Sequence, residues 1–396
     1  MMLVAIILMD LLAGMEFDLF VPSFPELQAH FGLTPFWVEA LLSVNFIGYC
    51  LSLFYVGSLA DRYGRKPIIL SGLVIFVIGS MLCVGGVNYP FLLVGRFLQG
   101  VGIAAPAILS FLIIADAYPI KRQQFFMAML NGAMNISVGI APVIGSYIAL
   151  YFQWRGNFVL LMALGLLVLL MTVFFVPAAK PSAQKETLSW RGYLPLFQSK
   201  PLLLLMVNIV LMMVPYWIFV GTSPLLYMQN LGVSLAHFGY YQGVLALAFA
   251  LGSIGFGLVM HRYAQKKLLR LAGIIYMLSF IAIAVVTVVN SHSPLLITLA
   301  LLLFTISEII PGTLLGPLCL NIMPHAKARV SAVLQAFRLL ATALSLQLAG
   351  YCYQGSFRSI GVMILVFILM LMITHFLVVR NRVLMNFSSN TNVEHH

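Results

Sequence analysis

Charged side chains are scarce in this chain of 396 residues, where Asp, Glu, Lys and Arg together make up 8%. A soluble globular domain carries about 25% charged residues, so this chain has too few to cover a folded surface that faces water. Hydrophobic residues make up 62%, and the mean hydropathy is +1.06. Most of the surface must therefore face the hydrocarbon of a lipid bilayer, which excludes an ordinary soluble fold.

Paired cysteines, histidine clusters and nucleotide-binding loops are also missing. The four cysteines have no paired spacing, and the eight histidines are scattered, so we expect no disulfide framework, metal site or cofactor. No GxxxxGK[ST] loop is present, which argues against an ATP-driven pump. The sequence contains no Ser/His constellation of the kind that would suggest an enzyme. The net charge of +11 comes from short segments between apolar runs, not from one basic folded face, so nucleic acid is not an expected partner.

Long apolar runs dominate what remains. About 20 apolar residues cross the bilayer as a helix, and the sequence contains twelve runs of that kind. It therefore predicts an all-α membrane protein with twelve transmembrane helices. The runs cover 2–24, 36–59, 67–87, 90–114, 123–150, 156–177, 201–227, 236–260, 268–289, 294–320, 328–351 and 358–379.

One long polar stretch divides the chain near its midpoint. We expect an N-terminal six-helix bundle at 1–177, a cytoplasmic linker at 178–200 and a C-terminal six-helix bundle at 201–382. Residues 383–396 form a predicted tail whose closing Val-Glu-His-His resembles the scar of an affinity tag.

The positions of Lys and Arg predict the orientation. If both termini are cytoplasmic, 17 of the 21 Lys and Arg residues fall in inside segments, two outside and two within helices. Cytoplasmic loops carry this excess of positive charge. We therefore predict a multi-pass protein of a bacterial inner membrane with both termini in the cytoplasm.

An internal repeat is legible at an offset of 200 residues. Gly, Arg, Tyr and Lys recur at equivalent positions of 57–66 and 257–266, each after the second helix of its half. Arg155 and Arg358 likewise each open a sixth helix. This pattern predicts parallel halves related by an axis along the membrane normal.

Three segments resemble signatures of the major facilitator superfamily. GSLADRYGRK at 57–66 resembles the loop between helices two and three, and RFLQGVG at 96–102 resembles the motif of helix four. GIAPVIG at 139–145 resembles the antiporter motif of drug exporters, but it has Ala141 where that motif has glycine.

Further stretches resemble the Bcr/CflA drug-resistance subfamily: DLFVP at 18–22, Ser223-Pro224 and the turn at 231–239. Asp10 and Asp18 are similar to the acidic pair of MdfA-type multidrug/proton antiporters. The resemblance implies a monomer of two bundles that exports drug-like amphiphilic small molecules by alternating access, driven by protons.

Acidic residues inside the first helix are the most informative feature of the chemistry. Each costs about 2.5–3.5 kcal/mol at a helix centre, so at least two of Asp10, Glu16 and Asp18 should avoid lipid. Asp10 and Asp18 differ by about 80° around a helix, so they can line one cavity face. Glu16 points away from them, toward another helix.

A carboxyl group that is alternately buried and exposed can carry protons across the membrane. We expect Asp10, Asp18 and Arg96 to couple protons to transport, with Arg96 pairing with Asp18. The alternative is a static buried ion pair that only sets helix packing.

Two more charges lie inside apolar runs, Glu308 and Arg338. Either they pair to offset desolvation, or they contact the substrate. With Arg96, Arg338 raises an alternative function: transport of one metabolite or organic anion, such as a carboxylate-type siderophore. The predicted substrate cavity comprises Asp10, Phe17, Asn45, Phe46, Tyr49, Asn131, Met134, Tyr216, Trp217, Glu308 and Arg338, although Met and aromatic residues at helical spacing are more often plain packing.

The loop between helices two and three suggests a latch between the halves, or simply a basic loop that sets topology. Gly64 permits a tight reversal, and Asp116 is a candidate partner for Arg65. The predicted gating residues are Gly57, Asp61, Arg62, Gly64, Arg65, Lys66 and Asp116. In helix five, Gly139, Pro142 and Gly145 predict a bend or a close helix contact.

Overall fold

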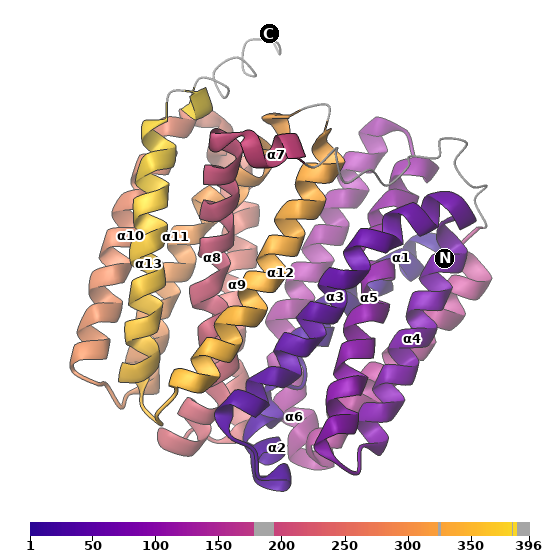
Figure 1. The fold of residues 1–396 in the computed structure, drawn as a ribbon, viewed down its shortest axis with the longest axis horizontal. Helices are drawn as coiled ribbons and strands as arrows, with labels where there is room; N and C mark the ends of the chain where they lie inside the picture. The colour runs from indigo at the N-terminus through magenta and orange to yellow at the C-terminus, as the bar shows by residue number, and fades with distance from the viewer. Residues whose placement is uncertain (178–193, 324–325, 382, 386–396) are drawn as a thin grey trace. The chain divides into compact units, whose positions relative to one another are not determined.

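The computed structural model describes residues 1–177, 194–323, 326–381 and 383–385, and within these ranges every regular element is helical (Figure 1). The segment 178–193, which contains most of the predicted linker, and the end of the tail lie outside the described residues. The long helices are α1 (Met2–Asp18), α3 (Pro35–Tyr63), α4 (Arg65–Gly85), α5 (Tyr89–Ala117), α6 (Ile120–Phe175), α8 (Lys200–Pro224), α9 (Leu235–Val259), α10 (Gln265–Val288), α11 (Pro294–Asn321), α12 (Lys327–Cys352) and α13 (Phe357–Arg380). Shorter elements are η1 (Val21–Ser23), α2 (Phe24–Phe31), α7 (Leu194–Gln198), the π-helical turn η3 (Leu225–Asn230) and η4 (Met260–Arg262).

The helices match the predicted all-α membrane fold. Ten helices of the described residues are long and apolar enough to cross a membrane. One of them, α6, has non-helical backbone angles at Gln153 (φ 58°, ψ −175°), which divides it into two spans. The 17 residues of α1 supply the remaining expected span. The break falls at Gln153, between the predicted fifth and sixth helices, and α6 continues through Pro142.

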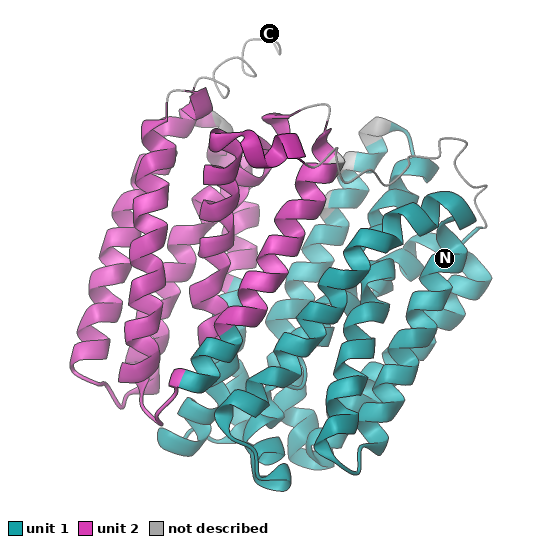
Figure 2. Ribbon diagram, in the orientation of Figure 1, with its two compact units in different colours: residues 1–188, 221–247, 346–351 teal, residues 189–220, 248–345, 352–396 magenta. Residues whose placement is uncertain are grey.

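The chain forms two compact units (Figure 2). Unit 1 comprises residues 1–188, 221–247 and 346–351, and unit 2 comprises the rest. Unit 1 thus contains the first half of the sequence together with two short segments from the second half. The division into six-helix halves at 178–200 stays a prediction.

Within unit 1 the chain reverses at Gly64 and Tyr118 at one end of the helices, and near Gly32 and Gln153 at the other. We call the latter the Gly32 end. The two segments from the second half pack at this end: Gln229 Nε2 donates to Gln28 Oε1 at 2.8 Å, and a Cβ on Gly350 would lie 2.8 Å from the Cα of Phe36. Sequence-distant residues therefore close this end of unit 1.

Glycines allow α1 and α6 to approach closely. A Cβ atom on Gly145 would overlap the carbonyl oxygen of Leu19, and one on Gly14 would overlap Ser137 Oγ. Helix α6 also meets α9 closely: a Cβ on Gly239 of α9 would lie 2.6 Å from the carbonyl oxygen of Pro142 in α6. Small residues at such contacts let helix backbones meet, as is common in membrane proteins. The close contact predicted for Pro142 and Gly145 is present.

Equivalent arginines support the internal repeat. In unit 1, Arg155 Nη2 donates to the carbonyl oxygen of Gly86, just after α4, at 3.3 Å. In unit 2, Arg358 Nη2 donates to the carbonyl oxygen of Val288, the last residue of α10, at 2.9 Å. Each guanidinium lies at a helix C-terminus, where the helix dipole favours positive charge.

The glycine contact at 145 yields a direct test. Gly145→Ala should lower the stability of the folded protein by about 1–3 kcal/mol, because the methyl group would force α1 and α6 apart. The matched control is Gly132→Ala on the same helix, where a Cβ meets nothing within 4 Å. Thermal unfolding in detergent, followed by the loss of monodisperse protein, measures both variants. Equal unfolding midpoints would contradict the close-packing account.

Candidate functional site

A buried ion pair joins Glu16 of α1 to Arg96 of α5 within unit 1. Arg96 Nη1 lies 2.9 Å from Glu16 Oε1, and both side chains are 0% exposed. The predicted pairing of Arg96 with Asp18 is therefore wrong. Glu16 lies two residues, or about 200° of helical rotation, from Asp18, so α1 turns Glu16 and not Asp18 toward α5.

Neutral side chains complete this ion pair. Asn45 of α3 donates from Nδ2 to Glu16 Oε1 at 2.5 Å, and Arg96 Nη1 also donates to Gln99 Oε1 at 2.6 Å. Gln99 in turn donates to Ser80 Oγ of α4 at 2.8 Å. The Arg96 guanidinium lies 4.2 Å from the ring centroid of Phe20. One charge pair thus connects four helices, and predicted cavity residue Asn45 is part of it.

The motif at 96–102 explains why α5 reaches this position. A Cβ on Gly100 would overlap the carbonyl oxygen of Asn45, and one on Gly102 would overlap the backbone nitrogen of Phe76 in α4. Glycine is required at both places because backbone atoms of the neighbouring helices occupy the space. The motif therefore holds Arg96 and packs α5 at once.

Asp10 lies deeper along α1 and has a different partner. Its side chain is 0% exposed, and its Oδ1 accepts a hydrogen bond from Ser110 Oγ of α5 at 3.1 Å. Its Oδ2 has no hydrogen-bond partner. Among the described residues, no cationic side chain lies within salt-bridge distance of this carboxyl group, in contrast to Glu16.

Asp18 contacts the segment of unit 1 that comes from the second half of the sequence. It is 1% exposed, and its Oδ1 accepts a hydrogen bond from Gln242 Nε2 of α9 at 3.1 Å. Its Oδ2 also lacks a partner. Asp10 and Asp18 therefore contact different helices, and their predicted shared cavity face stays a prediction.

Aromatic residues predicted for the cavity gather between α1 and α3. The rings of Phe17 and Phe46 stack with centroids 4.7 Å apart, and Phe17 and Tyr49 are 6.0 Å apart. Met134 lies beside α1, since its carbonyl oxygen would be 2.7 Å from a Cβ on Gly14. Asn131 is exposed, and its Nδ2 donates to the Met127 carbonyl oxygen one turn earlier.

The remaining predicted cavity residues belong to unit 2. Tyr216 and Trp217 contact edge to face, with centroids 5.8 Å apart. Arg338 donates to Gln335 Oε1 at 2.8 Å and to Met213 Sδ at 3.5 Å. Glu308 is 5% exposed and lies within electrostatic range of Arg338. Whether these residues pair or bind substrate stays open.

The loop between α3 and α4 has the predicted reversal. Gly64 has φ 91°, which only glycine adopts readily. Arg65 Nη1 lies 2.6 Å from Asp116 Oδ2 at the end of α5, so the predicted pair is confirmed. Lys66 Nζ donates to the Val173 carbonyl oxygen at 2.8 Å. Asp61 and Arg62 are exposed, and the space beside Gly57 is open.

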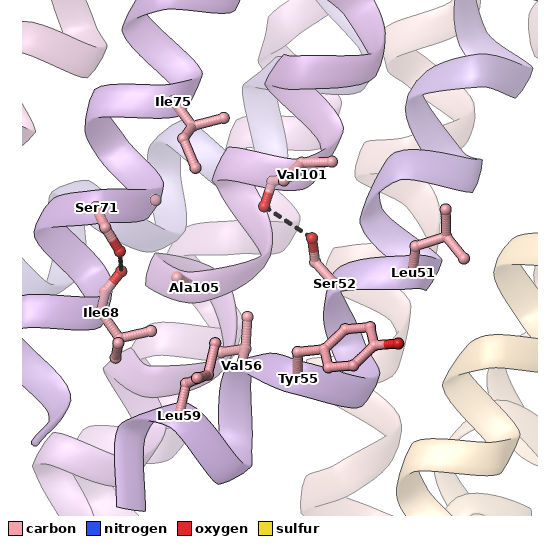
Figure 3. Close-up of a pocket in the computed structure, with 11 residues that line it drawn as sticks. Leu51, Ser52, Tyr55, Val56, Leu59, Ile68, Ser71, Ile75, Val101 and Ala105 are labelled. Atoms are coloured by element: carbon pink, nitrogen blue, oxygen red, sulfur yellow. Dashed lines mark hydrogen bonds between the residues drawn. The ribbon is translucent and has the colours of Figure 1, made fainter. Parts of the chain in front are cut away.

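A cavity of about 320 Å³ opens between α3, α4 and α5 (Figure 3). Ser52 Oγ donates to the Val101 carbonyl oxygen there at 3.1 Å, as Figure 3 shows. Tyr55, Leu51 and Leu59 on its wall are exposed, so the cavity is a recess in the flank of unit 1. None of the residues predicted for the substrate cavity lines it.

Two polar residues of this region were not predicted. Glu39 of α3 is 0% exposed, and Gln99 bridges the ion pair to α4. The free-energy cost of placing an acid inside an apolar helix applies to Glu39 as it does to the three acids of α1. Its position near the predicted start of the helix concealed that signal. Gln99 falls within the motif at 96–102, but the motif does not say which neighbouring side chain its amide contacts.

The sequence model of the Major Facilitator Superfamily matches residues 6–346. The chain belongs to this superfamily. The match extends across both halves of the sequence, and the family consists of membrane transporters and not enzymes. It therefore accounts for the internal repeat and for the helical fold together.

Curated relatives of this superfamily member are multidrug resistance proteins MdtL. The one from Citrobacter koseri is 31% identical over 224 residues, which cover 54% of this chain and 55% of the relative. The one from Klebsiella pneumoniae is 25% identical over 275 residues, or 68% of this chain and 69% of the relative. The aligned part thus spans between about half and two thirds of these relatives.

Solved transporters share the fold at low identity. A D-xylose-proton symporter superposes with a TM-score of 0.72 at 14% identity, covering 93% of this chain and 96% of its own. A bacterial homologue of the human lysosomal transporter Spinster gives 0.76 at 15% identity, covering 96% of each chain. Both superpositions cover nearly the whole facilitator chain, and at this low identity they show a shared fold.

The ion pair of this facilitator makes a quantitative prediction. Arg96→Met alone should cost about 3–5 kcal/mol of stability, because it leaves the Glu16 carboxylate buried without a counter-charge. Adding Glu16→Gln should restore much of that loss. A double-mutant cycle of unfolding free energies measures the coupling. Additive losses would show that the two charges do not stabilise each other.

Proposed function

We propose that this facilitator is a proton-coupled exporter of drug-like amphiphilic small molecules that works by alternating access. The curated relatives named multidrug resistance proteins support the substrate class. The observation that carries the coupling is the counter-charge among the three acids of α1. Each acid keeps one buried oxygen without a donor, but Glu16 is paired with Arg96, whereas among the described residues neither Asp10 nor Asp18 has a cationic partner within salt-bridge distance.

Asp10 and Asp18 suit proton transfer because their burial penalises a bare charge. A buried carboxylate without full hydrogen bonding is costly, and the cost falls when the group is protonated or reached by water. The two residues are eight positions apart, or about 12 Å along α1. Opening of either end of the helix bundle would therefore hydrate one acid before the other, which lets a proton enter from one side and leave to the other.

Arg96 has a positioning role in this scheme. Because its guanidinium is bound to Glu16 and Gln99, it orients α5 and α1 and contributes no free positive charge to a cavity. The alternative substrate, an organic anion such as a carboxylate-type siderophore, loses one of the two cations on which it rested. Arg338 remains as its support.

The ion pair of Arg65 with Asp116 lies within the N-terminal half, where it fixes the 57–66 loop against the end of α5 and so presents the loop as one side of a cytoplasmic latch. The pair is partly solvated, with the two side chains 19% and 53% exposed, and an exposed pair contributes only about 0–1 kcal/mol. Such a weak contact breaks readily during transport. The other charges of the 57–66 loop belong to this proposal.

We place the facilitator in a bacterial inner membrane as a monomer with both termini cytoplasmic. The support is the distribution of positive charge, 17 Lys and Arg residues on the assigned inner side against two outside. The Gly32 end is then the outer end. Reporter fusions at the loops containing Gly64 and Gly32 should report opposite sides of the membrane.

The transport proposal is tested in proteoliposomes with an imposed pH gradient. Asp10→Asn and Asp18→Asn should each abolish gradient-driven uptake of a cationic amphiphilic dye, because an amide cannot carry the proton. Binding of the dye and thermal stability should change little. Glu26→Gln is the matched control and should keep gradient-driven transport, because Glu26 lies in α2, outside the proposed coupling and latch, and the amide oxygen can still accept the hydrogen bond from the Trp154 backbone nitrogen.

Unchanged coupling in both aspartate variants would reject the assignment. Cationic, neutral and polyanionic candidates are compared in the same vesicles. Transport restricted to a polyanion, and lost in Arg338→Gln, would favour the alternative substrate over drug-like amphiphiles.

A further inference from the structure

Glu39 is a buried acid that the proposed coupling does not use. It lies on the second turn of α3, about 6 Å along the helix from its start at Pro35, and its side chain is 0% exposed. Neither Oε1 nor Oε2 has a hydrogen-bond partner. Native structures rarely leave both oxygens of a buried acid without donors, so this arrangement calls for an explanation.

The surroundings of Glu39 come from the second half of the sequence within unit 1. A Cβ on Gly221, near the end of α8, would overlap Glu39 Oε2, and a Cβ on Gly350 of α12 would lie 2.9 Å from Glu39 Cγ. One turn further along α3, Ser43 Oγ accepts a hydrogen bond from Gln347 Nε2 at 2.9 Å. The acid therefore fills a slot between two glycines at the Gly32 end.

No charged group faces this slot among the described residues. Gly221 of α8 and Gly350 of α12 contact the Glu39 side chain, and the polar pair one turn along α3, Ser43 with the amide of Gln347, makes no hydrogen bond to its carboxyl oxygens. Bringing a carboxylate into such surroundings would carry a large desolvation penalty with nothing to offset it. A neutral carboxylic acid fits there at much lower cost.

We propose that Glu39 is a proton-operated lock of the outer end. When segments 221–247 and 346–351 separate from α3, Glu39 faces the outer solution and is a carboxylate. Closure requires one proton from that solution to bind a carboxylate oxygen, and opening returns it to the same side. Glu39 thus makes closure depend on external acidity without adding to the protons carried across. This inference rests on the proposed alternating access.

Spin labels measure this lock directly. Labels at Ala29 of α2 and Ala236 of α9, both at least partly exposed in unit 1, report separation of the outer end. The four native cysteines are replaced by alanine. The changes Asp10→Asn and Asp18→Asn remove the two acids of α1 that are proposed to change protonation, so that Glu39 remains. In nanodiscs, the ratio of closed to open protein should then fall by up to about tenfold per pH unit as the pH rises.

Glu39→Gln is the decisive variant, because the amide has the size of the acid but cannot ionise. It should hold the outer end closed at every pH and make the ratio independent of pH between 5 and 8. Ser43→Ala is the matched control, which loses a polar contact in the same slot but keeps the pH dependence. A Glu39→Gln variant that titrates like its parent, or that fails to fold while Ser43→Ala folds, overturns the lock.

The same measurements separate this proposal from the one on which it rests. A single label distance at every pH, with and without a transported amphiphile, would reject alternating access and the lock together. Two distances with an unchanged slope in Glu39→Gln would reject the lock alone. Loss of proton-driven export in the aspartate variants, with the slope preserved, would support both.

Discussion

The pairing of Glu16 with Arg96 is the interaction on which the architecture of unit 1 depends. Two charges that are 0% exposed can remain ionised in a membrane protein only if each satisfies the other. Their contact requires α1 and α5 to lie at one depth and one rotation. Asn45 and Gln99 extend the requirement to α3 and α4 through their hydrogen bonds.

Glycine makes that arrangement possible, since lipid supplies no hydrophobic force that drives helices together. Gly100 lets α5 lie directly on the backbone of α3 at Asn45, and Gly145 lets α6 lie on the last turn of α1. The motifs that resemble those of drug exporters are therefore packing elements first. Their polar residues acquire meaning because the glycines bring the helices into contact.

Once Glu16 is neutralised, the other acids differ in kind. Within the part of the chain that the structure describes, Asp10 accepts from a serine hydroxyl, Asp18 from a glutamine amide, and Glu39 from no donor. The acid without any donor, Glu39, lies at the Gly32 end, whereas Asp10 and Asp18 each accept one neutral hydrogen bond. We infer that the charge balance of α1 separates a static scaffold from groups that can change protonation during transport.

Much of the fold could be read from the sequence because it follows from local rules. The lengths of the apolar runs predicted the spans. The glycine at position 64 predicted the reversal, where the backbone has φ 91°. The candidate site was harder. The periodicity of α1 correctly turned Glu16 toward another helix, but it left Arg96 assigned to Asp18, because a helical wheel says which residues share a face and not which neighbour that face meets.

The membrane environment, the helical spans, the repeat and the reversal at Gly64 follow from composition or from residues close in the chain, so they could be predicted. The partners of the buried charges depend on the folded arrangement of the helices. Gln242 lies 224 positions from Asp18, and Gly350 lies more than 300 from Glu39. Such contacts depend on helix rotation and depth, which are set by packing across the whole unit and leave no local pattern.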